Sequence, residues 1–211
     1  MCPGIAFMQY HIAKMNVPLK SEVLDPKKLI ATADRNLAEV LYRNPINRSM
    51  YSPTRLSFIE TFIGIATLVL VRGPVTSEQI IRDNWRPAKE YLEFAVQLTL
   101  NDPNDFTDEG CEVLYGRAGL LYALSYLRNA TQNYGPQERV PLENLISDTT
   151  ISRLVDSIVF RGKRGAHFLS LGFRGSGAVN LPPLMWSWHG KRYLGAAHGV
   201  GKNNIACFRK F

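Results

Sequence analysis

Apolar residues recur at helical spacing along one early segment of the chain. The stripe runs from Leu29 to Leu41, and charged side chains occupy the opposite face. Asp25 and Pro26 precede it in the order typical of an N-cap and a first helical residue. The pattern predicts an amphipathic helix that ends before Pro45, because the residue before a proline avoids helical backbone angles.

The next segment, residues 57–71, is apolar on every face and predicts a second helix. A helix of this kind is buried on all sides, so we expect an inner layer of helices behind the surface ones. The apolar run is only about 14 residues long, whereas a membrane-spanning helix needs about 20. Glu60 also interrupts it. A buried core helix that ends at Gly73 is therefore the better interpretation.

The rest of the chain alternates between helical patterns and polar or glycine-rich stretches. Helices are predicted within residues 77–84, 88–100, 114–127 and 150–160, and Pro87 separates the first two. Loops are predicted over residues 101–109, 129–141 and 162–183. The alternation expected of a strand is absent from the sequence. Repeated pairs of an amphipathic and a buried helix indicate a solenoid or a closed ring of helices.

The distribution of charged residues limits the kinds of molecule that the chain is expected to bind. The net charge is +7, yet the basic residues are spread along the chain rather than concentrated in one block. A nucleic-acid binder gathers such charge on one face, so no nucleic-acid partner is expected. Two local clusters are interpreted as solvated surface, with attraction to membrane lipids or acidic peptides as the alternative. They are Arg161, Lys163 and Arg164, and Lys202, Arg209 and Lys210.

Cysteine usage favours a reducing compartment. Cys2, Cys111 and Cys207 lie far apart, and no pair has the spacing of a metal-binding motif. A disulfide framework is not expected, so a cytoplasmic location fits best. The N-terminal segment contains Lys14 and Lys20 and lacks the apolar core of a secretory signal.

Two glycine-containing segments carry a resemblance to a known family. Residues 112–124 read EVLYGRAGLLYAL, and residues 189–201 read HGKRYLGAAHGVG. Both resemble the repeats of LanC-like (lanthionine synthetase C-like) proteins, and the second contains the Ala-His-Gly turn of that family. A weaker first copy lies at residues 62–66, which read FIGIA. The resemblance extends over residues 20–201.

The resemblance implies an all-α fold in which an outer ring of helices surrounds an inner ring. Each inner helix would begin at a glycine motif. Residues 1–201 would form part of such an α/α toroid, an incomplete ring. After this point the chain departs from the family pattern, so residues 202–211 are interpreted as the aberrant tail of a truncated member. The motif glycines are Gly116, Gly119, Gly195, Gly199 and Gly201.

The resemblance also implies a chemistry of peptide modification. Bacterial members of the family add a peptide cysteine thiol to dehydroamino acids, and eukaryotic members bind glutathione and add its thiol to dehydrated residues. A zinc ion held by two cysteines and one histidine lowers the pKa of the thiol in these proteins, because the thiolate is the nucleophile. The ligand positions of the family lie beyond the matching segments. We therefore expect this chain to bind no zinc and to lack the activity.

The same resemblance assigns candidate site residues. His198 matches the active-site histidine of the family, a general acid or base. Glu112 lies where cyclases place an acidic residue, usually aspartate, and is the second catalytic candidate. Its alternative role is that of a helix-start acid favoured by the helix dipole. Lys191 and Arg192, with Tyr193 beside them, are candidates to bind a carboxylate of glutathione or a peptide substrate. Their alternative is an exposed surface.

Two other functions stay open at this point. One is a non-catalytic scaffold that binds glutathione, a protein partner or a membrane surface through the open edge of the incomplete ring. A carbohydrate-active toroid is the last alternative. It requires two carboxylates that flank the substrate, and only Glu112 is suitably placed in the sequence.

Overall fold

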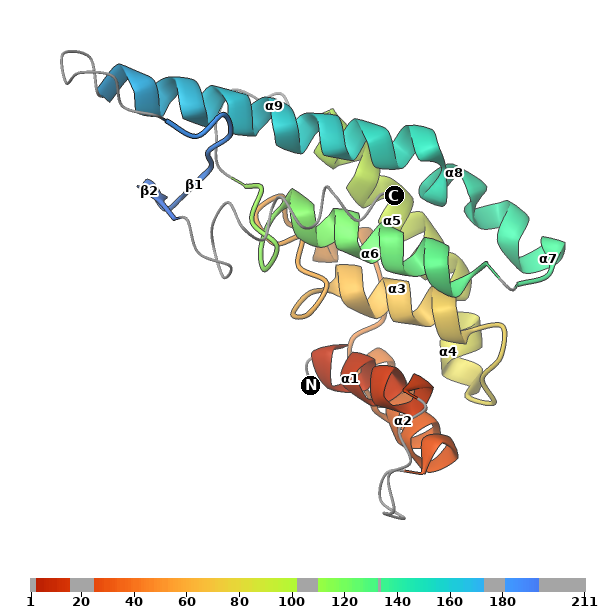
Figure 1. The fold of residues 1–211 in the computed structure, drawn as a ribbon. Coiled ribbons are helices and arrows are strands. Elements are labelled where there is room, and N and C mark those ends of the chain that lie inside the picture. The colour runs from red at the N-terminus through yellow and green to blue at the C-terminus, as the bar shows by residue number, and fades with distance from the viewer. Residues whose placement is uncertain (1–2, 16–24, 102–109, 133, 173–180, 194–211) are drawn as a thin grey trace.

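The computed structural model describes residues 3–15, 25–101, 110–132, 134–172 and 181–193. These residues form an all-α structure with one small hairpin, so the predicted fold class is confirmed (Figure 1). The six longer helices are α1 (Pro3–Lys14), α2 (Pro26–Arg43), α3 (Phe62–Arg72), α5 (Trp85–Leu100), α6 (Arg117–Ala130) and α9 (Asp148–Gly172). The short ones are η2 (Arg48–Met50), α4 (Gln79–Asp83), α7 (Pro136–Arg139), η3 (Val140–Leu142) and α8 (Glu143–Ile146).

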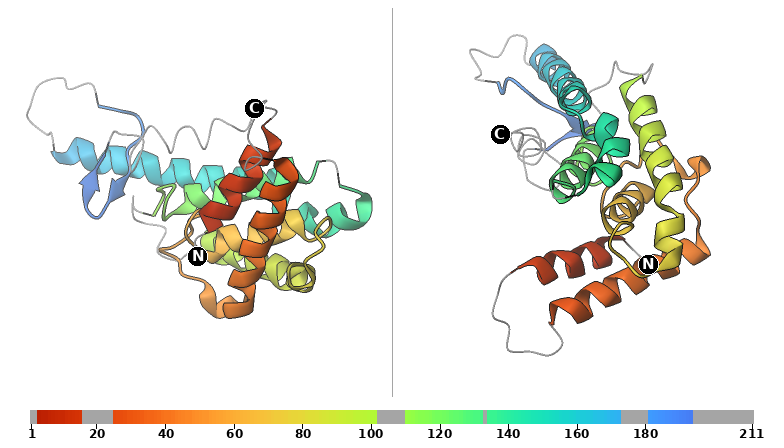
Figure 2. Two further views of the ribbon diagram at one scale, coloured as in Figure 1. Left: turned by 90° about the horizontal axis from the view of Figure 1, so that it is seen from below. Right: turned by 90° about the vertical axis from the view of Figure 1, so that its right-hand side faces the viewer.

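The longer helices pack in two rows. Helices α1, α3 and α6 lie next to one another and form an inner row, in which α3 contacts both of the others. Helices α2, α5 and α9 form an outer row, and each packs on the inner helix that precedes it in the sequence (Figure 2). This pairing agrees with the helical hairpins expected from the sequence. A ring formed by these rows stays a prediction.

Helix α3 lies at the centre of the core. All of its residues from Ile63 to Val71 are buried, as a helix that is apolar on every face requires. The largest fully buried side chains come from helices of both rows and include Leu37, Leu41, Ile63, Leu68, Leu70, Tyr91, Leu92, Leu120, Leu121 and Leu124. None of the described helices is both long enough and apolar enough to cross a membrane.

The start of α3 differs from the prediction. We expected the helix to begin near residue 57, but it begins at Phe62, and the hydroxyl of Thr61 accepts the N–H of Ile63 as its N-cap. The preceding residues form a turn that folds back over the helix. A Cβ atom on Gly64 would lie only 1.7 Å from the carbonyl oxygen of Phe58. The close contact between this turn and Gly64 therefore sets the first helical residue.

Two segments interpreted as breaks belong to helices. Pro87 does not separate two helices but lies in the first turn of α5, where its missing N–H group has no helical partner to lose. The predicted loop over residues 129–141 contains the end of α6 and all of α7. The short helix predicted within residues 77–84 is confirmed as α4.

Helix α9 is longer than its pattern indicates. It was expected to end at Phe160 before a glycine-rich loop, but it continues to Gly172. The glycine at position 162 accommodates a neighbour, because a Cβ atom there would lie 2.5 Å from the ring of Trp186. The indole of Trp186 donates a hydrogen bond to the carbonyl of Ile158 at 2.9 Å. The glycine thus provides space for a tryptophan against the helix rather than ending it.

Helix α1 has no counterpart in the sequence prediction. It packs along α2 and beside α3, and the N–H of Gly4 donates to the carbonyl of Ile59 at 3.1 Å. The ring of Phe7 meets the rings of Phe58, Tyr122 and Tyr126 edge-on. These contacts attach α1 to both of the other inner helices.

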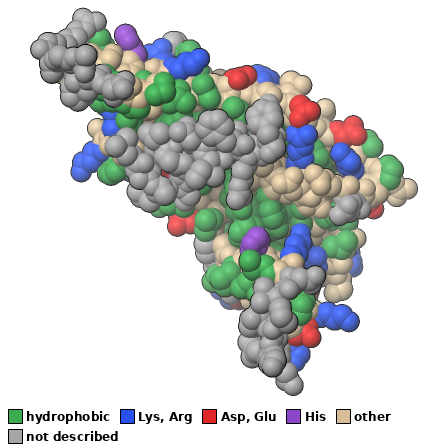
Figure 3. Space-filling model, in the orientation of Figure 1, with side chains coloured by type: hydrophobic (Ala, Val, Ile, Leu, Met, Phe, Trp, Pro, Cys, Tyr) green, Lys and Arg blue, Asp and Glu red, His purple; other side chains and the backbone are tan. Residues whose placement is uncertain are grey.

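The surface agrees with the scattered charge of the sequence. On the face drawn in Figure 3, basic and acidic side chains are intermingled with neutral ones. One basic cluster is nevertheless not solvated surface as expected. Arg161 is buried, whereas Lys163 is exposed and Arg164 is half-buried.

Candidate functional site

The turn that precedes α6 holds the first candidate, Glu112. Its carboxylate oxygen Oε2 accepts the backbone N–H of Tyr115 at 2.7 Å, and its carbonyl accepts the N–H of Gly116 at 2.6 Å. The side chain is buried. Glu112 therefore stabilises the turn that immediately precedes α6. A catalytic role for Glu112 stays a prediction.

The two motif glycines described by the structure permit close backbone packing. A Cβ atom on Gly116 would lie 2.3 Å from the carbonyl oxygen of Gly110. One on Gly119 would lie 2.5 Å from the carbonyl oxygen of Val113 and 2.7 Å from that of Leu56. Only residues without a side chain fit here, so the motif brings the turn and a neighbouring loop against the first turn of α6.

Two buried arginines accompany this turn. Arg117 lies at the first position of α6 and Arg161 comes from α9, and both are almost fully buried. Their Nη1 atoms lie 3.5 and 4.0 Å from the point that a Cβ atom on Gly110 would occupy. A second nitrogen of Arg117, Nη2, donates to the carbonyl of Thr99 at 3.3 Å. Two guanidinium groups and one carboxylate are thus buried around the same short turn.

A β-hairpin covers the start of α6. Strand β1 (Ser187–Trp188) pairs antiparallel with β2 (Lys191–Arg192), and Trp188 lies opposite Lys191. The two connecting residues, His189 and Gly190, have positive φ angles, as the turns of two-residue hairpins require. His189 is therefore a turn residue of this hairpin.

An aromatic stack attaches the hairpin to the helix start. The ring of Trp188 lies parallel to that of Tyr115, with centroids 5.2 Å apart and an interplanar angle of 7°. Trp186, just before the hairpin, is buried against α9. Lys191, Arg192 and Tyr193 are exposed. The predicted basic residues are therefore held beside the Glu112 turn, with their side chains accessible.

The structure brings together part of the predicted site. Glu112, the first two motif glycines and the basic hairpin lie at one end of α6, whereas His198, Gly195, Gly199 and Gly201 lie outside the described residues. The sequence analysis assigns none of Tyr115, Arg117 and Arg161 to the site, and it placed Arg161 in a basic cluster expected on the surface. Arg117 had a signal, because it lies between the two motif glycines. Arg161 gave no signal of burial at the site, because its helix was expected to end one residue earlier.

Metal-binding residues are not grouped in the described parts of the chain. No cluster of three or more His, Cys, Asp or Glu side chains is found there. Cys111 is fully buried in the core, and Cys2 and Cys207 lie outside the described residues. The described residues therefore do not supply the donor set of the zinc site implied by the family, and the expectation of no bound zinc stays a prediction.

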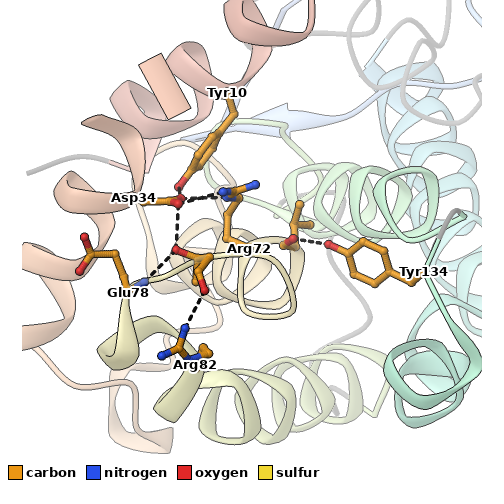
Figure 4. Close-up of polar contacts among 8 residues, drawn as sticks. Tyr10, Asp34, Arg72, Glu78, Arg82 and Tyr134 are labelled. Carbon is orange, nitrogen blue, oxygen red and sulfur yellow. Dashed lines mark hydrogen bonds and ion pairs between the residues drawn. The ribbon is translucent and has the colours of Figure 1, made fainter. Parts of the chain in front are cut away.

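A second polar cluster joins α1, α2 and α3 (Figure 4). Arg72 donates from Nε and Nη2 to the two carboxylate oxygens of Asp34, each at 2.8 Å. The hydroxyls of Tyr10 and Thr76 donate to the same carboxylate at 2.6 and 2.8 Å. Beside it, Tyr134 donates a hydrogen bond to the carbonyl of Val71. The sequence pattern gives no sign of this network, because its members are far apart along the chain.

The network perturbs the acidity of its members. Burial alone would raise the pKa of Asp34, but the hydrogen bonds and the positive charge of Arg72 outweigh it and hold that pKa below its usual value. Burial and the neighbouring carboxylate raise the pKa of Tyr10. Asp34 is therefore ionised and Tyr10 protonated at neutral pH.

Comparison with known proteins agrees with the family indicated by the glycine motifs. Residues 2–209 match the model of the family described as lanthionine synthetase C-like protein. The chain is also 27% identical over 158 residues to Glutathione S-transferase LANCL1 from Danio rerio. That alignment covers 74% of this chain and 33% of the relative, so the chain spans about a third of the relative's length. On this evidence the chain belongs to the lanthionine synthetase C-like protein family.

Proposed function

We propose that this chain is a LanC-like protein that binds glutathione, and that the basic hairpin beside the start of α6 binds a carboxylate of that peptide. The observation that carries the proposal is the exposure of Lys191, Arg192 and Tyr193 on a hairpin fixed by the Tyr115–Trp188 stack. The name of the relative, a glutathione S-transferase, supports the same ligand.

The chemistry of the hairpin suits an acidic peptide. Glutathione carries two carboxylates, and the guanidinium of Arg192 can bind one of them through two parallel hydrogen bonds. Lys191 adds a compact positive charge, and Tyr193 offers a hydroxyl donor. Because Trp188 is stacked on Tyr115, the strand that carries these groups is already ordered before the ligand arrives, which limits the entropy lost on binding.

Isothermal titration calorimetry of the 211-residue chain with reduced glutathione tests this proposal. The double variant Lys191→Gln/Arg192→Gln should bind glutathione about tenfold more weakly, because it loses charge-assisted hydrogen bonds to the ligand. The double variant Arg153→Gln/Lys163→Gln removes the same charge from exposed positions of α9 and is the control. It should bind as the parent chain does. The proposal would be overturned if both double variants bound glutathione equally weakly, or if neither bound it more weakly than the parent chain.

We also infer that the 211-residue chain neither binds zinc nor adds thiols to dehydroamino acids. The support is the donor set of the described residues, which contains no cluster of metal-binding side chains. Elemental analysis of the purified chain should give less than one zinc per molecule after dialysis. An assay with glutathione and a dehydroalanine peptide should give no thioether above the uncatalysed rate. One tightly bound zinc ion per chain would contradict the inference.

A further inference from the structure

A small pocket lies at the end of the inner row that is remote from the basic hairpin. Its volume is about 160 Å³, and residues at the C-terminal ends of α1, α3 and α6 line it. The polar part of the lining consists of Lys14, Arg72 and the tyrosines Tyr10, Tyr126 and Tyr134. The other described lining residues are apolar, so the pocket contains positive groups and hydroxyls without a carboxylate in its wall.

Arg72 is held in a fixed position in this wall. Two of its nitrogens, Nε and Nη2, are bound to Asp34, and the guanidinium lies over the ring of Tyr10 at 5.2 Å. Within the described part of the chain, Nη1 makes no hydrogen bond, and the side chain keeps 16% of its surface exposed. Nη1 is therefore oriented before a ligand binds.

Tyr126 supplies a second available donor. The hydroxyls of Tyr10 and Tyr134 donate to Asp34 and to the carbonyl of Val71. The Tyr126 hydroxyl has no hydrogen-bond partner among the described residues, although its ring packs on Phe7 and Phe58. Burial raises the pKa of Tyr126 to about 12, so the hydroxyl keeps its proton at neutral pH.

The pocket carries a net positive charge even after the Asp34–Arg72 ion pair is taken into account. Asp34 balances the charge of Arg72 but lies behind it, outside the pocket wall. Lys14 lies exposed at the rim, where its ammonium can reach a ligand. A ligand that accepts hydrogen bonds from Arg72 and Tyr126 and carries a negative charge would satisfy all three groups.

We propose that this pocket binds a small oxyanion, a phosphate or a carboxylate group, through Arg72 Nη1, the Tyr126 hydroxyl and Lys14. The volume fits this class of ligand, because it holds roughly five water molecules at about 30 Å³ each. It is smaller than the cavities of about 300 Å³ or more that enclose whole organic ligands. The pocket is therefore a site for an anionic group, separate from the proposed glutathione site.

Titration calorimetry on the full chain at constant ionic strength tests this proposal with two probes, inorganic phosphate and acetate. At least one should bind saturably, and the probe that binds identifies the group as a phosphate or a carboxylate. The double variant Lys14→Gln/Tyr126→Phe should weaken that binding at least tenfold. Tyr126→Phe alone keeps the ring contacts with Phe7 and Phe58, so it should fold normally and still weaken binding severalfold.

The control variant is Tyr42→Phe/Lys163→Gln, which makes the same chemical changes at exposed positions. It should bind the oxyanion with unchanged affinity. No saturable binding of either probe would overturn the proposal, as would unchanged binding by Tyr126→Phe. Phosphate or acetate should also leave glutathione binding unchanged, so failure of the oxyanion site can be told apart from failure of the glutathione site.

Discussion

Replacing Arg72 with methionine is expected to lower the free energy of unfolding by about 3 kcal/mol, because the substitution leaves the Asp34 carboxylate buried without its positive partner. The pair is well enclosed: 16% of the Arg72 side chain and 9% of the Asp34 side chain remain exposed. Removing one partner of a buried ion pair costs about 3–5 kcal/mol, and the residual exposure of Arg72 favours the lower end of that range. Urea denaturation followed by circular dichroism measures the difference.

Arg43→Met is the matched control for this prediction. Arg43 pairs with Glu39 on the surface, where the two side chains are 74% and 47% exposed. Loss of such a pair should change stability by less than about 0.5 kcal/mol. The double variant Asp34→Asn/Arg72→Met should recover part of the loss, because it leaves no charge unpaired. Equal losses in Arg72→Met and Arg43→Met would contradict the prediction.

Acid unfolding provides a second readout of the same pair. The pKa of Asp34 is lower in the folded chain than in the unfolded chain, because its hydrogen bonds and Arg72 outweigh the effect of burial. Its stabilising contribution is therefore complete above the unfolded-state pKa of about 3.9 and is lost as the pH falls through the lower folded-state value. The difference in unfolding free energy between the parent chain and Arg72→Met should therefore be largest near neutral pH and should shrink as the pH falls below about 3.9.

Gly64→Ala is the other substitution expected to have a large effect, with a loss of about 3 kcal/mol in the free energy of unfolding. The new Cβ atom would meet the backbone carbonyl of Phe58 at 1.7 Å, and backbone cannot move aside as a flexible side chain can. The higher helix propensity of alanine, worth about 1 kcal/mol, does not offset this clash. Thermal or urea denaturation of the purified variant measures the loss.

Gly172→Ala tests whether the effect comes from the clash rather than from the residue type. A Cβ atom at position 172 would meet nothing within 4 Å, and the residue lies at the end of α9. This variant should be as stable as the parent chain or more stable by up to about 1 kcal/mol. If both alanine variants behave alike, the close packing of Gly64 against the turn before α3 does not limit stability.

The sequence allows the helices to be predicted where local signals and packing agree. Asp25 and Pro26 mark the start of α2, and the side chain of Asp25 accepts hydrogen bonds from the first turn as its N-cap. The uniformly apolar segment is the buried helix α3. In both cases the local pattern is the physical cause of the helix, so the sequence alone is sufficient to predict it.

Glycine is ambiguous where packing partners are distant in sequence. Gly162 was interpreted as part of a loop, but α9 continues through it. The glycine is needed there because the ring of Trp186 occupies the space that a side chain would fill. Gly116 lies directly before α6, and its packing partner, the turn that begins at Gly110, is nearby in the chain. A glycine inside a helical pattern can therefore be assigned only when its neighbour in space is known.

The candidate site was only partly predictable for a similar reason. The family resemblance proposed Glu112 and the basic residues of β2 as site residues, but it gave no sign of the contact between the Glu112 turn and the hairpin. That contact, the stack of Tyr115 on Trp188, bridges residues far apart in sequence, and strands of two residues are too short to show alternation. The Asp34 network was not predicted, because its members are far apart in the sequence. They meet only in the folded chain, where they are buried together, and sequence spacing does not reveal this.

The tryptophan indole signals in a ¹H–¹⁵N spectrum test the proposed glutathione site most directly. The chain has three tryptophans: Trp85 and Trp186 donate to backbone carbonyls inside the fold, whereas Trp188 is half-buried in the hairpin. With reduced glutathione, the Trp188 signal should shift saturably, and the Trp85 signal should stay in place. Saturable binding that leaves the Trp188 signal unmoved would contradict the account.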